Sequence, residues 1–133
     1  LLIFCLLFSA ISSKDFNEVK KTVESFFIQH FKVDACCFEI MKDKDLKNLE
    51  NETGLEMNKD IIHMGPFSKE KMISFFQDEK IKSGVISVLK LKNGFGLLKI
   101  GSLDQAKYLG DGDTTFIEYI RDIIGAVLGS KNA

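Results

Sequence analysis

The chain has 133 residues, of which 45% are hydrophobic and 28% are charged, and its formal net charge is −1. This length predicts one domain, and the apolar content is sufficient to build a core. Acidic and basic residues are interleaved, which argues against a nucleic-acid binder, because such proteins usually carry a basic surface. One proline and ten glycines argue against a disordered chain.

The three cysteines, Cys5, Cys36 and Cys37, are odd in number and have no spacing typical of a disulfide framework. We therefore interpret them as reduced thiols of a cytoplasmic protein. Cys36 and Cys37 are neighbours on a predicted strand, so they point to opposite faces and do not share a metal ion. His30 and His63 have no second ligand at metal-binding spacing. We expect no metal and no cofactor.

Residues 1–11, LLIFCLLFSAI, form an apolar run that is too short to cross a bilayer. We expect them to be the tail of an upstream helix that is buried between domains or partners. The core of a signal peptide is an alternative, because small residues follow the run. A membrane anchor is a further alternative, although our expectation for the chain is that it has no membrane partner.

A second helix is predicted from a cap at Ser12 and Asp15 to about His30. Its apolar residues recur at spacings of three and four, which is the period of a helix with one apolar face. They are Phe16, Val19, Val23, Phe26, Phe27 and Phe31. The lysines and glutamates of this segment fall mainly on the opposite side, so we expect the helix to cover a sheet.

Residues 34–42, DACCFEIMK, predict the first strand, on which Cys37 and Glu39 share a face. The following segment, 43–59, is highly charged and has only a weak apolar pattern. We expect it to be a loop or a short helix at the surface.

A short strand is predicted at residues 60–64, where it carries His63, and Gly65-Pro66 ends it. Ser68 is a suitable cap for a helix that runs to about Gln77. The apolar residues Met72, Phe75 and Phe76 are expected to face inward from this helix.

Two apolar strands are predicted within residues 84–102, joined by Asn93-Gly94. This dipeptide favours a two-residue type I′ turn, in which both central residues need a positive φ. The turn would place Lys92 opposite Phe95 and Lys90 opposite Leu97. The same register would place Leu89 opposite Leu98, Val88 opposite Lys99 and Ser87 opposite Ile100.

The predicted hairpin has two unlike faces, because side chains alternate along a strand. One face must be buried, since it carries Val85, Ser87, Leu89, Leu91, Leu98 and Ile100. The other mixes Val88, Phe95 and Leu97 with Lys90, Lys92 and Lys99. In this register Lys90 and Lys99 lie on a diagonal. If the mixed face encloses a cavity, they favour an anionic ligand such as a nucleotide, and if it is open they are ordinary solvated lysines.

A loop with one helical turn follows the hairpin, and the last helix is predicted to start near Thr114. Its apolar stripe within residues 116–128 is wider than one sheet contact requires, which is typical of a helix that is also an interface. The order of helices and strands predicts an α+β domain with a central antiparallel sheet and terminal helices on one face.

This order resembles the GAF domain, and particular residues extend the resemblance to a GAF-like bacterial family labelled domain of unknown function 484. The strand ending FGLLKIGS and the following LDQAKYLGDGDTTFIEYI are similar to the end of that family. The matching residues are Gly96, Leu97, Leu98, Gly101, Ser102, Asp104, Tyr108, Thr114, Phe116 and Ile117. Upstream, Gly65-Pro66, Phe75-Phe76 and Ser83-Gly84-Val85 occupy the expected places. Lys99 and Asp113 depart from the pattern, which has a small residue and a glycine there.

The resemblance implies that residues 1–133 form a single GAF-like domain that lacks the family's N-terminal helical region. It implies terminal helices that often pair subunits, and a ligand cavity on the opposite face of the sheet. It implies no reaction, so we do not expect an enzyme. The candidate ligand-binding residues on the mixed face and its neighbours are Cys37, Glu39, His63, Lys90 and Lys99.

Three hypotheses for function remain open. The first is a cytoplasmic regulatory or sensory domain that forms a homodimer through residues 1–11 and 116–128 and binds a small molecule. The second is a protein-interaction scaffold without a ligand. The third is a cysteine-dependent enzyme similar to the GAF-fold methionine sulfoxide reductases, in which Cys37 would react.

Overall fold

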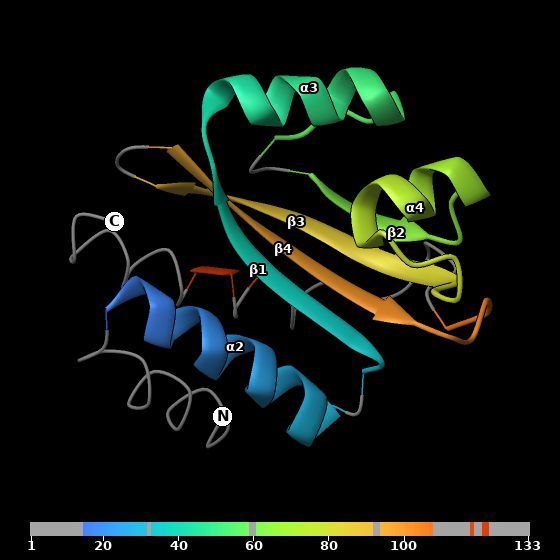
Figure 1. The fold of residues 1–133 in the computed structure, drawn as a ribbon, viewed down its shortest axis with the longest axis horizontal. Helices are drawn as coiled ribbons and strands as arrows, with labels where there is room; N and C mark the ends of the chain where they lie inside the picture. The colour runs from blue at the N-terminus through green and yellow to red at the C-terminus, as the bar shows by residue number, and fades with distance from the viewer. Residues whose placement is uncertain are drawn as a thin grey trace.

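The computed structural model describes residues 15–31, 33–58, 61–91 and 94–107, together with Glu118, Arg121 and Asp122. Within these residues, three helices and four strands follow one another along the chain (Figure 1). In chain order they are α2 (Phe16–Phe31), β1 (Ala35–Met41), α3 (Asp43–Thr53), β2 (Ile62–Gly65), α4 (Lys69–Phe76), β3 (Ser83–Leu91) and β4 (Gly94–Ser102).

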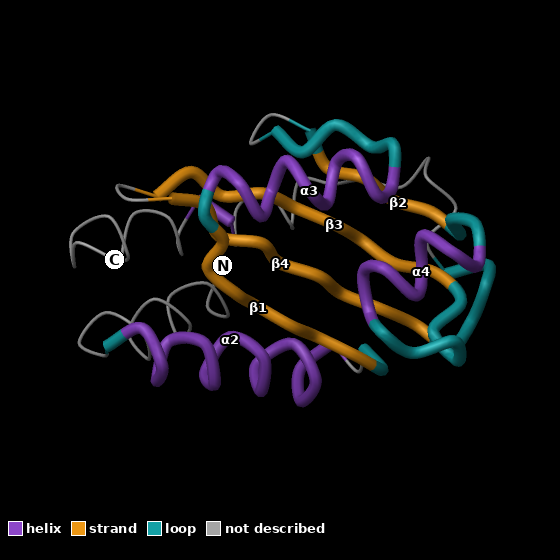
Figure 2. The backbone as a smooth tube through the Cα atoms, turned by 45° about the horizontal axis from the view of Figure 1, so that its top comes forward, coloured by secondary structure: helices purple, strands orange, loops and turns teal. Residues whose placement is uncertain are grey.

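The four strands form one antiparallel sheet in the order β1-β4-β3-β2. Figures 1 and 2 show α2 on one face of this sheet and both α3 and α4 on the other. The predicted α+β class and the antiparallel sheet are therefore confirmed for the described part of the chain.

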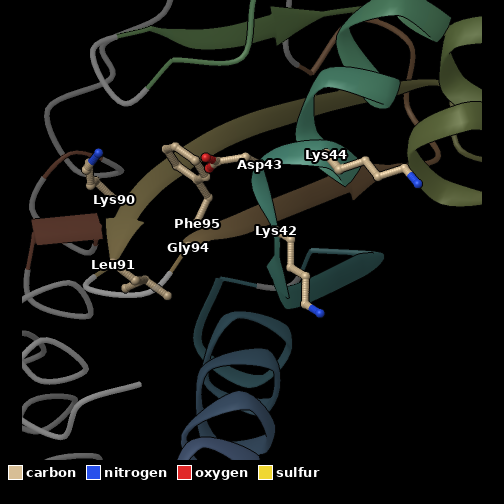
Figure 3. Close-up of a pocket in the computed structure, with 7 residues that line it drawn as sticks. All are labelled: Lys42, Asp43, Lys44, Lys90, Leu91, Gly94 and Phe95. Carbon is tan, nitrogen blue, oxygen red and sulfur yellow. The ribbon is translucent and has the colours of Figure 1, made fainter.

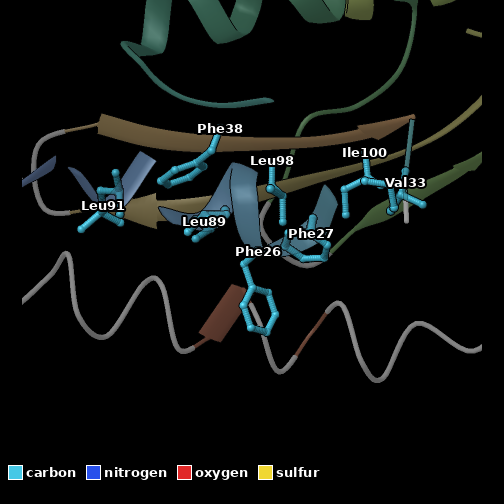
Figure 4. Packing of buried hydrophobic residues seen from close by; sticks show 11 residues of the cluster. Phe26, Phe27, Val33, Phe38, Leu89, Leu91, Leu98 and Ile100 are labelled. Atoms are coloured by element: carbon cyan, nitrogen blue, oxygen red, sulfur yellow. The ribbon is translucent and has the colours of Figure 1, made fainter. Parts of the chain in front are cut away.

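The face covered by α2 holds the larger apolar cluster. Val19, Val23 and Phe27 of α2 are at most 1% exposed, and they pack with the apolar residues predicted for the buried hairpin face. Those residues are Val85, Leu89, Leu91, Leu98 and Ile100. In Figure 4, Phe27 lies beside Leu98, whereas the ring of Phe26 extends away from the sheet. The predicted apolar face of the hairpin is thus confirmed as core.

The mixed face of the hairpin is packed by helices α3 and α4. Ile86, Val88 and Leu97 are at most 1% exposed and belong to a second apolar cluster. Its other buried members are Leu46 and Leu49 of α3, Phe75 of α4, and Met57. Side chains therefore fill the middle of the face on which we had placed a ligand cavity.

The hairpin register differs from the prediction by two residues. Leu91 pairs with Gly94 and Lys90 pairs with Phe95. A turn centred on Asn93-Gly94 would instead have paired Lys92 with Phe95. Gly94 has φ +145° and belongs to β4, where a Cβ would lie 2.9 Å from the carbonyl oxygen of Met41. The glycine therefore permits close approach to β1. Because the shift is an even number of residues, every side chain stays on its predicted face.

Local capping explains where the helices begin and end. The side chain of Ser68 accepts a hydrogen bond from the backbone N–H of Lys71, which confirms the predicted cap of α4. At α2 the observed acceptor is Asp15, which receives the N–H of Glu18 at 3.0 Å. Helix α3 occupies the segment expected as a loop or short helix, and Gly54 ends it with φ 72°.

Several predictions fall outside the described residues. They concern the helix over residues 1–11, the cap at Ser12 and most of the helix expected from Thr114. Within the ranges given above, no helix combines the length and apolarity needed to span a bilayer.

Candidate functional site

The five predicted ligand-binding residues all lie on the face covered by α3 and α4. His63, Ile86, Lys99 and Cys37 form one row across the sheet, because each is paired with the next. Ile86 is fully buried and separates His63 from Lys99, whose backbones are roughly 10 Å apart. The structure therefore places Cys37 and Lys99 next to each other on neighbouring strands, and Glu39 lies two residues further along β1.

The ammonium group of Lys99 is engaged by other groups of the fold. Its ammonium lies 2.7 Å from a carboxylate oxygen of Glu39 and donates a hydrogen bond of 2.8 Å to the carbonyl of Phe75. That carbonyl belongs to the last turn of α4, where intrahelical partners are missing and a positive charge is favourable. The lysine side chain is only 12% exposed. Lys99 thus joins β1, β4 and α4.

Neither described cysteine has the character of a reactive thiol. Burial raises the pKa of Cys37, and the nearby ammonium of Lys99 only partly opposes this effect. Burial, with a smaller contribution from Glu24, raises the pKa of the Cys36 thiol far above its ordinary value. Both groups are therefore protonated at neutral pH, whereas a nucleophilic cysteine must be a thiolate.

His63 and Lys90 lie apart from this group. The Nε2 atom of His63 is 2.6 Å from the carbonyl oxygen of Glu56, so the ring is held by the segment after α3. The ammonium of Lys90 lies 5.4 Å from the centre of the Phe95 ring, at the hairpin end. Lys99 is four residues along β4 from Phe95, about 13 Å away. The predicted diagonal pair of lysines is therefore wrong, because it depended on the incorrect register.

An open pocket of about 490 Å³ lies where α3 begins beside the hairpin. Its lining includes Lys42, Asp43, Lys44, Lys90 and Phe95, of which only Lys90 was a predicted site residue. In Figure 3 the three lysine side chains point in different directions. The pocket has a positive lining, but its ammonium groups do not converge on one point.

The edge strand β1 is protected by α2. A carboxylate oxygen of Glu24 accepts a hydrogen bond of 2.9 Å from the backbone N–H of Phe38, and Lys20 forms an ion pair with the same carboxylate. Burial alone would lower the pKa of Lys20, but its hydrogen bond to Glu24 raises the value above normal. A charged pair at an edge strand blocks pairing with another strand. The helical spacing of these two residues was visible in the sequence, but their position over β1 was not.

A glycine pair at the other end of the hairpin receives the ring of Phe76. Gly84 and Gly101 are opposite each other on β3 and β4. A Cβ at Gly84 would lie 2.8 Å from the Phe76 ring, and a Cβ at Gly101 would lie 2.8 Å from Ile81 and 3.1 Å from that ring. These glycines are required by packing, and the sequence signal for them was the pair of Gly-Ser and Ser-Gly dipeptides at the strand ends.

Buried hydroxyl groups hold the turn after β4. The Oγ of Ser83 donates to the carbonyl of Asp104 at 2.6 Å, and the Oγ of Ser102 accepts from the N–H of Asp104 at 3.0 Å. Asp34, which precedes β1, accepts the N–H of Leu103 at 2.8 Å. Many residues that carried the family resemblance are therefore used to build the fold.

The fold and these contacts define an α+β domain with an open four-stranded antiparallel sheet, which packs against α2 on one face and against α3 and α4 on the other. Among its described residues, no three histidine, cysteine or acidic side chains are grouped to hold a metal ion.

Residues 11–131 match the family described as "Protein of unknown function, DUF484". The chain belongs to this family. A search of curated proteins finds no match.

Proposed function

We propose that this chain is a cytoplasmic, GAF-like regulatory domain that acts through protein contacts and forms a homodimer through residues 1–11 and 116–128. The observation that supports it best is the packing of the described sheet, which has α2 against one face and α3 and α4 against the other. The sequence adds two further strongly apolar segments to this packed unit. An apolar surface beyond the needs of one core favours a partner subunit.

Light scattering after size exclusion tests the pairing. We expect a dimer at tens of micromolar, and a clean monomer would overturn the proposal. Ile124→Lys should shift the protein toward the monomer, because it places a charge in the apolar stripe. Ile73→Lys is the matched control, since Ile73 of α4 is 40% exposed and lies outside both segments. It should leave the dimer intact.

A small anionic ligand at the hairpin pocket is the second candidate. The observation that favours it is the partly exposed ring of Phe95 beneath Lys90, because an aromatic face and an ammonium together suit a nucleotide. Calorimetric titration with ADP would reveal binding that Lys90→Ala weakens by about five-fold or more. Lys21→Ala, an exposed lysine on α2, is the control. Absence of heat with the unmodified protein would remove this candidate.

The geometry gives little support to a cysteine-dependent reductase. The raised pKa of the Cys37 thiol opposes the thiolate that such chemistry needs. The adjacent Lys99 is already engaged by Glu39 and Phe75. If the protein nevertheless reduced methionine sulfoxide and Cys37→Ser abolished that activity, the regulatory proposal would need revision.

A further inference from the structure

A groove lies at the end of the sheet opposite the hairpin turn. It runs between the start of α4, the segment that follows α4, and the turn after β4. Two hollows of about 280 and 540 Å³ form it, and both are lined by Lys69, Glu79 and Lys82. We call this surface the α4 groove and define it by Phe67, Lys69, Met72, Glu79, Lys80, Lys82 and Leu103.

The α4 groove has an apolar base with one prominent exposed side chain. Met72 is 3% exposed and Phe67 is partly buried, so both are anchored in the fold. Leu103 is 54% exposed, which is the largest exposed fraction among the bulky apolar residues described as exposed. An apolar side chain from a partner would find contact here without unfolding any part of the domain.

The charged lining of the groove is mainly positive. Its lining includes three exposed lysines, Lys69, Lys80 and Lys82, and a single carboxylate, that of Glu79. The ammonium of Lys82 donates a hydrogen bond of 3.0 Å to the backbone carbonyl of Glu79. The Glu79 carboxylate is 3.9 Å from the ammonium of Lys69, and both side chains are 71% exposed. Such an exposed pair contributes little, so the lysine remains available to a stronger acidic partner.

We propose that the α4 groove docks an acidic peptide segment of a partner protein, with an apolar side chain against Leu103 and carboxylates beside Lys69, Lys80 and Lys82. This inference rests on the proposed function, because it assumes that the domain acts through protein contacts. Charge complementarity selects the acidic segment and accelerates its association, while the apolar contact slows its release. No residue of the groove belongs to the segments proposed for pairing, so the two proposals can be tested with separate variants.

Fluorescence anisotropy with the full chain tests the proposal. The probe is a short fluorescein-labelled peptide in which glutamate alternates with leucine. We expect saturable binding, a loss of about ten-fold or more in affinity for Lys80→Glu/Lys82→Glu, and weaker binding by Leu103→Ser. Lys21→Glu/Lys47→Glu is the matched control, because both lysines are exposed and lie outside the groove, and the net charge changes equally. It should stay within about two-fold of the unmodified protein.

Two results would overturn the proposal: no binding by the unmodified protein, or equal losses for the groove variant and its control. A peptide in which serine replaces leucine should bind more weakly, and equal affinity would remove the role of Leu103.

Light scattering on the same samples separates this inference from the pairing. A dimer that fails to bind the peptide refutes the groove alone, and a monomer that binds it refutes the pairing alone. Unchanged melting of each variant ensures that the comparison concerns folded protein.

Discussion

At the scale of single residues, Lys99 shows how a side chain that suggested ligand binding is used by the fold. Its position on the mixed face was predictable from the alternation of the strands. Its partners were not, because Glu39 lies 60 positions away in the sequence and Phe75 contributes only a carbonyl. A sequence pattern reports the chemistry of a side chain, whereas tertiary packing decides what that side chain meets.

Replacing Lys99 by methionine should therefore destabilise the domain. The change keeps the apolar stem but removes the ion pair with Glu39 and the hydrogen bond to Phe75. We expect a loss of about 1–2 kcal/mol in the free energy of unfolding, since Glu39 is partly exposed. Lys47→Met, at an exposed position of α3, should change it by less than about 0.5 kcal/mol. Urea denaturation measures both, and equal effects would contradict the assigned role.

Because of the Cys36 thiol, we expect the free energy of unfolding to depend on pH in the alkaline range. Its pKa is raised in the folded chain, mainly by burial, whereas the unfolded chain releases this proton near pH 8.5. The unfolded state then binds fewer protons, so the free energy of unfolding falls as pH rises, by up to about 1.4 kcal/mol per pH unit. Cys36→Ala should reduce this fall. Urea midpoints at pH 8 and pH 10 provide the comparison, and parallel pH profiles would refute the prediction.

At the scale of helices and strands, the glycine pair couples α4 to the hairpin. Gly84→Ala would place a methyl group 2.8 Å from the Phe76 ring and 3.1 Å from the carbonyl of Ile100. We expect a cost of about 1–3 kcal/mol from overpacking. The cost should be smaller when Phe76 is already alanine, because part of the clash is then removed. A double-mutant cycle by denaturation measures this coupling, and strict additivity would contradict it.

The elements also differ in how far the sequence predicts them. Helix α2 has an apolar period of three and four, and the cap of α4 at Ser68 is local, so both were predicted correctly. Helix α3 was predicted only as a loop or a short helix because few of its residues are apolar, and Leu46 and Leu49 become core only against the sheet. The hairpin register was predicted incorrectly. Gly94 lies close to the backbone of Met41 on β1, and a rule based on the local turn sequence does not include such a contact.

At the scale of the whole molecule, the decisive feature is that described helices pack against both faces of the sheet, α2 beside β1 on one and α3 and α4 on the other. The sequence predicted both the antiparallel sheet and its apolar face. It did not predict that α3 and α4 together cover the mixed face, because the short and charged α3 does not have a strong core pattern. Because of this packing, we place the candidate functional sites at the periphery of the sheet and in the terminal segments, and not at the centre of the sheet.

Native mass spectrometry of freshly purified protein tests this view most directly, because one spectrum reports both the number of subunits and any retained small molecule. A packed domain that works through protein contacts should give a mass equal to two chains with no adduct. A monomer would contradict the pairing. A reproducible adduct of small mass would contradict a function through protein contacts alone and favour a ligand-binding domain.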